Sequence, residues 1–172
     1  MKLLTEILRE AEEPLLLYHA GPEKITKLDA SKIKGGSRAS IGWGVYFSSS
    51  KYKAGDYGTE VTVIDGRKLH ILDMRKPVTQ EFVNAAREYA NSLPTDGLNI
   101  IRTSIVKRMV DMFSDGVGDV FDRVRKNMLD SFNHNQEMVF LDMLRALGYD
   151  TVQDGYEYAI FDMDAGTNAI IQ

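Results

Sequence analysis

The chain has 172 residues, of which 44% are hydrophobic, a formal charge of −4 and no cysteine. The length and the hydrophobic content suit one globular domain with a buried core, and the lack of cysteine excludes disulfides, thiolate metal sites and cysteine nucleophiles. The negative charge argues against sequence-independent binding to nucleic acid, and no apolar run approaches the roughly 20 residues of a membrane-spanning helix.

The N-terminal segment MKLLTEILREAEE carries mixed charges and apolar residues at helical spacing, namely Leu3, Leu4, Ile7 and Leu8. This spacing predicts an amphipathic helix. The segment lacks the long apolar centre and the small-residue cleavage site of a secretory signal. We therefore expect a leader helix over residues 1–13 and a single domain over residues 14–172.

Short strands and helices are predicted after the leader. Residues 15–21, LLLYHAG, form a buried apolar run that ends at a Gly-Pro turn, and residues 44–48 form a second strand-like run. Residues 23–33 are expected to form a short helix and a connection, and a further helix is expected from about Ser50 to Tyr57.

The stretch TEVTVIDGRKLHILDM, residues 59–74, alternates around Asp65-Gly66. Asp-Gly suits the tight turn that joins two antiparallel strands, so this pattern predicts a β-hairpin.

The pattern becomes helical between Pro77 and Leu147. Four helices are predicted, near residues 79–92, 97–113, 118–132 and 135–147. Gly148 is expected to end the last helix, and YDTVQD and YEYAIFD predict two closing strands. Strands at both ends of the sequence must share a sheet, because neither group can bury a face alone. The expected fold class is α+β, with a helical insertion at about 77–147.

Four side chains are candidates for a site, and each also has an ordinary structural explanation. His19 ends a buried strand, where a histidine usually makes a structural hydrogen bond. Tyr46 suits a core and Tyr57 the end of a helix. Glu157 alternates along YEYAIFD on the face of Ala159, so its carboxylate lies either at an exposed edge or in a cavity.

Taken together, three stretches resemble a known signature. LYHAG, then GWGVYF, then YEYAIFD follow the order of the His–Tyr–Glu motif in the diphtheria-toxin/poly(ADP-ribose) polymerase class of ADP-ribosyltransferases. The spacing of Tyr46 and Tyr57 also matches that class. The resemblance covers about residues 15–65 and 145–162. It implies an ADP-ribosyltransferase-like split β-sheet core that carries the helical insertion.

The resemblance implies that NAD is the substrate and that the bond between nicotinamide and ribose is broken through a cationic transition state, as in glycoside hydrolysis. Tyr46 and Tyr57 would stack on the nicotinamide, and the Gly21 backbone would bind its amide. His19 would hold the adenosine ribose. Glu157 would bind the 2′-hydroxyl of the other ribose and stabilise the cation. Glu157, Tyr46 and His19 form the expected catalytic set.

The expected NAD-binding set is larger and consists of His19, Ala20, Gly21, Gly44, Tyr46, Phe47, Ala54, Tyr57 and Arg38. Gly42 and Gly44 would let the backbone approach the dinucleotide closely. Lys32, Lys34 and Arg38 would lie near the pyrophosphate, although a solvated loop explains them equally well. No metal is expected, because the three histidines are scattered without ligand spacing.

Two positions depart from the family pattern. Position 54 is alanine where polymerase-type members often carry a serine that binds the nicotinamide amide. Position 155 is glycine where the arginine-modifying class has Glu or Gln, and that class also has an arginine and a Ser-Thr-Ser stretch not found here. Arginine is therefore a less expected acceptor. The large regulatory domains of the eukaryotic polymerases do not occur in this sequence, which favours transfer of a single ADP-ribose.

The leader resembles the short leaders of internal head proteins of large tailed bacteriophages, which the phage prohead protease cuts after Leu/Ile-x-Glu. Leu8-Arg9-Glu10 has this form, although such tripeptides occur in many helices. Cleavage after Glu10 would imply a virion protein that is carried in the phage head and acts in the bacterial host cytoplasm.

The expected function is an NAD-dependent mono-ADP-ribosyltransferase that modifies a macromolecular acceptor. We expect this acceptor to be a protein rather than a nucleic acid, and we expect no membrane partner. The alternatives are an NAD glycohydrolase, and a non-enzymatic packaged head protein or ADP-ribose-binding module with the same fold. An RNA 2′-phosphotransferase is a further alternative, but it would need more positive charge at its site.

Overall fold

The computed structural model describes residues 14–32, 43–97, 99–132 and 136–171. The leader with its cleavage position, and the predicted site residues Arg38, Lys34 and Gly42, lie outside these ranges. No helix in the described part of the chain is long and apolar enough to cross a bilayer.

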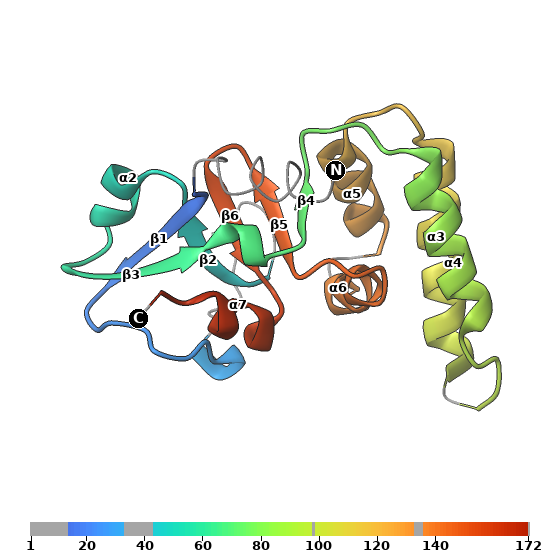
Figure 1. Ribbon diagram of the computed structural model, residues 1–172. Coiled ribbons are helices and arrows are strands. Elements are labelled where there is room, and N and C mark those ends of the chain that lie inside the picture. Colours follow the sequence, from blue (N-terminus) through green and yellow to red (C-terminus); the bar gives the residue numbers. More distant parts are fainter. Residues whose placement is uncertain (1–13, 33–42, 98, 133–135, 172) are drawn as a thin grey trace, which may run out of the picture.

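Six strands of the described chain form one sheet (Figure 1). The strands are β1 (Leu16–Gly21), β2 (Val45–Ser48), β3 (Glu60–Asp65), β4 (Ile71–Asp73), β5 (Thr151–Asp154) and β6 (Glu157–Ile160). Their order is β3-β1-β2-β6-β5-β4, and only β4 and β5 pair in parallel. Strands from both ends of the sequence therefore share one sheet, and the expected α+β class is confirmed.

The sheet is nearly divided between β1 and β2. These strands pair at a single position, Tyr18 with Ser48. By contrast, β1 and β3 pair over six positions, and β2 and β6 pair over four. The sheet therefore consists of two halves, β3-β1 and β2-β6-β5-β4, joined at one residue pair.

The predicted hairpin over residues 59–74 is wrong, because β3 and β4 lie at opposite edges of the sheet. Asp65 accepts a hydrogen bond from the Arg67 backbone N–H at 3.1 Å and starts a 3₁₀-helix, η2 (Gly66–Lys68), instead of a hairpin turn. The chain from Asp65 to Ile71 spans at most about 20 Å when extended. Six flat strands would hold the outer two about 24 Å apart, so the sheet must curl.

Helices α3 (Gln80–Ser92), α4 (Asn99–Asp115), α5 (Phe121–Ser131) and α6 (Glu137–Ala146) form the insertion between β4 and β5. All four helices of the insertion are confirmed within three residues at each end. Gly148 follows α6 with φ +88°, as expected for a residue that ends a helix.

Helix α2 (Lys51–Gly55) is shorter than predicted, and α7 (Met163–Ala169), capped by the Asp162 side chain, was not predicted. Where a short helix and a connection were expected over residues 23–33, the described chain is irregular over residues 23–29 and has only a 3₁₀ turn, η1 (Ala30–Lys32).

Tertiary hydrogen bonds explain why residues 23–29 are not helical. The Ile25 N–H donates to Thr62 Oγ1 at 2.7 Å, and the Leu28 N–H donates to Thr167 Oγ1 at 3.0 Å. In a helix that began at residue 23 only the Leu28 N–H would have had an internal partner, and both donors are satisfied instead by threonine hydroxyls from β3 and α7.

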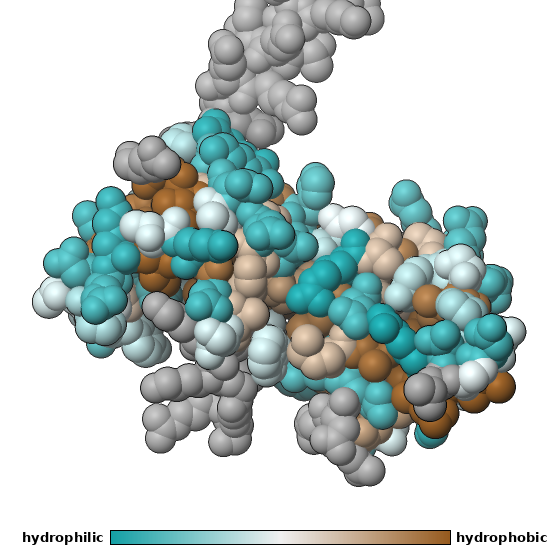
Figure 2. All heavy atoms as spheres, turned by 90° about the horizontal axis from the view of Figure 1, so that it is seen from below, coloured by the Kyte–Doolittle hydropathy of each residue, from teal (hydrophilic) through white to brown (hydrophobic). Residues whose placement is uncertain are grey.

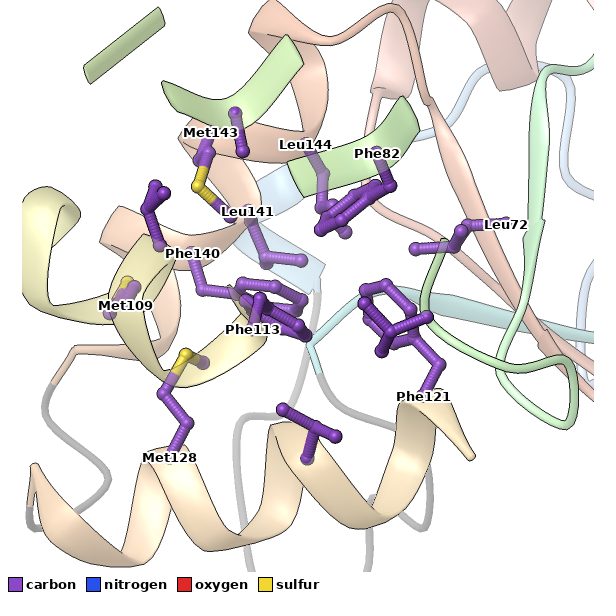
Figure 3. Close-up of a cluster of buried hydrophobic side chains, with 14 of the residues drawn as sticks. Leu72, Phe82, Met109, Phe113, Phe121, Met128, Phe140, Leu141, Met143 and Leu144 are labelled. Carbon is purple, nitrogen blue, oxygen red and sulfur yellow. The ribbon is translucent and has the colours of Figure 1, made fainter. Parts of the chain in front are cut away.

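The larger hydrophobic cluster fills the space between the insertion and β4, β5 and β6. Phe82, Phe113, Phe121 and Phe140 come from four helices and point toward one another, with Leu72 of β4 beside them (Figure 3). Figure 1 shows these helices gathered beyond one side of the sheet. The insertion therefore supplies most of the core that covers one face of the sheet.

A second cluster occupies the opposite face of the sheet, beneath α7, and includes Leu17, Phe47 and Ile160. The predicted alternation of the last strand is confirmed, because Tyr158 belongs to this cluster and Ala159 to the other one. Polar side chains cover much of the described surface, with apolar patches between them (Figure 2).

The insertion also holds the start of β2. The Trp43 N–H donates to Glu137 Oε1 of α6 at 3.2 Å, and the buried guanidinium of Arg125 lies 4.0 Å from the same oxygen. Trp43 itself packs against the larger cluster. The tryptophan between Gly42 and Gly44 thus contributes to the core.

Candidate active site

A pocket of about 390 Å³ lies where β1 and β2 separate. Its walls come from β1, β2, α2 and its following loop, the β5–β6 turn and the start of β6. The lining residues are Tyr18, His19, Ala20, Tyr46, Phe47, Ser48, Lys53, Ala54, Asp56, Tyr57, Tyr156 and Glu157. The volume falls in the usual range for small-molecule sites. The three residues of the predicted catalytic set, from three strands, therefore line one pocket.

His19 is fixed by a hydrogen bond between strands. Its Nδ1 lies 2.7 Å from the Tyr46 carbonyl oxygen. A carbonyl can only accept, so Nδ1 carries a proton and the neutral ring has its free lone pair on Nε2. The ring also packs against Phe47, with centroids 5.5 Å apart. Because β1 and β2 pair at one position only, this side chain supplies a further link between them next to the pocket.

The two tyrosines differ in exposure. Tyr46 is half-buried and packs against the larger hydrophobic cluster, whereas Tyr57 is 78% exposed. The loop that carries Tyr57 lies directly on the end of β1, because a Cβ at Gly58 would sit 2.4 Å from the Gly21 carbonyl oxygen. This contact holds the loop in place, and both tyrosines line the pocket.

Glu157 begins β6 and is half-buried in the pocket wall. Its neighbour on β5, Asp154, accepts a hydrogen bond from Arg75 Nε at 2.6 Å, and this bond raises the pKa of Arg75. Gly155 has φ +64°, and a Cβ there would lie 2.3 Å from an Arg75 nitrogen. The Arg75 guanidinium therefore lies directly against the Gly155 backbone, beside the pocket wall.

The other predicted residues fall into two groups. Ala20, Phe47 and Ala54 line the pocket. Gly21 lies beside it, where a Cβ would be 3.5 Å from His19 Nε2, but is not part of the described lining.

Gly44 is also outside the described lining, and its surroundings give a different reason for a glycine. A Cβ there would meet the Ile160 carbonyl oxygen at 2.8 Å. The Gly44 backbone therefore lies close to the backbone of β6, where the pairing of β2 with β6 begins.

Sequence reasoning missed five lining residues: Tyr18, Ser48, Lys53, Asp56 and Tyr156. Lys53 Nζ lies 5.6 Å from the centre of the Tyr156 ring, so this pair connects α2 to the β5–β6 turn across the pocket mouth. A signal was available for Lys53, because the helix predicted from Ser50 to Tyr57 would have put it one turn before Tyr57. No local pattern indicates Ser48 or Tyr156, because the strand register brings them to the site.

The described residues contain no group of three or more His, Asp or Glu side chains arranged to hold a metal ion. Comparison with protein-family models, with curated proteins and with solved structures found no match. The functional interpretation of the pocket therefore depends on its own residues and their geometry.

We expect Gly44→Ala to lower the free energy of unfolding by about 1–3 kcal/mol, because the added methyl group must push β2 away from β6. Gly55→Ala is the matched control, since a Cβ there has open space, and it should be neutral or slightly stabilising. Urea denaturation of the wild type and the two variants measures the free energy of unfolding of each. Equal losses in both variants would contradict the assigned contact.

We expect the His19 ring to be protonated on Nδ1 and not on Nε2 when it is neutral, because the Tyr46 carbonyl accepts at 2.7 Å. Long-range ¹H–¹⁵N correlation spectra at pH 8.5 distinguish the two tautomers. The exposed His70, whose Nδ1 lies 3.9 Å from the Asp150 carboxylate, gives a second histidine signal for comparison. An Nε2-protonated His19 would exclude the hydrogen bond between the strands.

Proposed function

We propose that this protein is an NAD-dependent mono-ADP-ribosyltransferase with an ADP-ribosyltransferase-like split sheet. The observation that carries the proposal is the meeting of His19, Tyr46 and Glu157 in one pocket. These residues come from distant parts of the sequence and follow the family order. The near division of the sheet at this pocket also supports the proposal.

The pocket supplies the groups that the reaction needs. The bond between the ribose C1′ and the nicotinamide nitrogen breaks, and its electron pair leaves with nicotinamide. The carboxylate of Glu157 stabilises the cation that forms on the ribose. A nucleophile of the acceptor then bonds to C1′ and loses its proton.

Binding is assigned to the other walls of the pocket. The half-buried Tyr46 and the exposed Tyr57 offer aromatic faces to the nicotinamide, which limit the access of water. His19, held through Nδ1, keeps its Nε2 edge for a ribose hydroxyl. Ala54 offers no hydroxyl to the nicotinamide amide, so that contact falls to backbone groups such as Gly21.

The acceptor is proposed to be a host protein, at a side chain other than arginine. The carboxylate or amide that the arginine-modifying class carries two residues before its glutamate has no counterpart here. The left-handed backbone at Gly155, with φ +64°, opposes most side chains at that position.

The decisive assay incubates the full chain with NAD labelled in its adenylate phosphate and a bacterial lysate. We expect label on a macromolecule, and Glu157→Gln should reduce the rate about a thousandfold while changing NAD affinity less than about tenfold. Tyr57→Ala should weaken NAD binding more than it lowers the rate of transfer from bound NAD. Glu88→Gln, an exposed change on α3, is the matched control.

Two other outcomes are informative. Release of free ADP-ribose without labelled acceptor would identify an NAD glycohydrolase that uses the same pocket. A wild-type chain that neither binds nor consumes NAD would refute the proposed enzyme and leave the non-enzymatic alternatives.

We further propose that the protein is encoded by a bacteriophage, is carried in the phage head and acts in the host cytoplasm. The support is Leu8-Arg9-Glu10 in the leader. Incubation with a phage prohead protease should remove ten residues, as mass spectrometry of the intact product would record. Glu10→Gln should block the cut, and an uncut wild-type chain would end this part of the proposal.

A further inference from the structure

Glu157 belongs to a row of paired residues that crosses the sheet. Tyr18 of β1 pairs with Ser48 of β2, Ser48 pairs with Glu157 of β6, and Glu157 pairs with Asp154 of β5. Directly opposite residues of antiparallel strands point to the same face. The row thus sets a hydroxyl on one side of Glu157 and a carboxylate on the other.

The two neighbours of Glu157 differ in what they can offer. Asp154 is already bound by Arg75 Nε at 2.6 Å, and an ionised carboxylate only accepts hydrogen bonds. Ser48 carries a hydroxyl, which both donates and accepts. Opposite Cβ atoms in such pairs are typically about 5 Å apart, so a serine hydroxyl can reach a glutamate oxygen.

The Ser48 oxygen is itself held in place. It accepts a hydrogen bond from the Ser50 backbone N–H at 3.0 Å. A hydroxyl that accepts from a backbone N–H keeps its own proton for another partner. Ser48 is only 9% exposed and lines the pocket. Its hydroxyl proton therefore has little contact with bulk water.

We propose that the Ser48 hydroxyl donates a hydrogen bond to the Glu157 carboxylate and holds it toward the pocket. This inference rests on the proposed function and adds a positioning residue to it, since Ser48 acts through Glu157. A hydrogen bond from a hydroxyl to a carboxylate is shorter and stronger than one between neutral groups. It restricts the torsions of a flexible side chain before NAD arrives, which is the preorganisation that charge stabilisation requires.

The test compares Ser48→Thr with Ser48→Val in the full chain. Both residues are β-branched and suit a strand, and they differ in the hydroxyl that the proposal needs. Steady-state NAD consumption gives kcat, and equilibrium binding gives the NAD dissociation constant. We expect Ser48→Thr to keep kcat within about threefold and Ser48→Val to lower it at least about tenfold, with the NAD dissociation constant unchanged within about twofold.

A double-mutant cycle shows whether Ser48 acts through Glu157. In a Glu157→Gln background, replacing Ser48 by Val should change the residual kcat less than about twofold, because the carboxylate is already gone. Thermal unfolding of each variant reports whether it is folded. Ser131→Ala, which removes a hydroxyl bonded to the Asn127 carbonyl in α5, is the remote control.

Three results would overturn the inference in an active enzyme. The first is a Ser48→Val variant as fast as Ser48→Thr. The second is weaker NAD binding at unchanged kcat, which would mean that the hydroxyl contacts the ligand. The third is an equal loss with and without the Glu157 carboxylate, which would mean a general structural effect. A wild-type chain without NAD turnover refutes the proposed function instead, and the positioning role falls with it.

Discussion

The single backbone pairing between Tyr18 and Ser48 is the constraint on which the rest of this structure depends. Two strands that separated one residue earlier would leave two unconnected sheets, and strands that paired fully would close the pocket. The hydrogen bond from His19 to Tyr46 strengthens this narrow junction beside the pocket. One residue of the proposed chemistry therefore also contributes to holding the sheet together.

The helical insertion supports the site from behind. Its four helices supply most of the larger hydrophobic cluster, and Ala159 and Tyr46 pack against that cluster from the strands beside the pocket. Glu137 of α6 holds the backbone at Trp43, where the chain enters β2. The position of Tyr46 and the register of Glu157 thus depend on residues that lie outside the family-like stretches.

Patterns of neighbouring residues predicted the features that depend on neighbouring residues, namely helices and their ends. The four helices of the insertion follow from apolar periodicity, and the left-handed Gly148 follows from the end of that periodicity. The hairpin failed because an aspartate before a glycine can also cap a 3₁₀ turn, as Asp65 does through the Arg67 N–H. The order of strands is not local, so nothing in residues 59–74 indicated that β3 and β4 would lie at opposite edges. In the same way, the motif indicated His19 and Glu157, but the strand register alone brings Ser48 beside that glutamate.

The five-residue link from β3 to β4 has a mechanical consequence. It joins the two edge strands of the sheet across at most about 20 Å, so it limits how far the sheet can flatten. A sheet that flattened would pull β3 and β4 apart against this link. Since α3 begins seven residues after β4, a short covalent connection joins this edge of the sheet to the helices, in addition to the packing of Leu72 in the larger cluster.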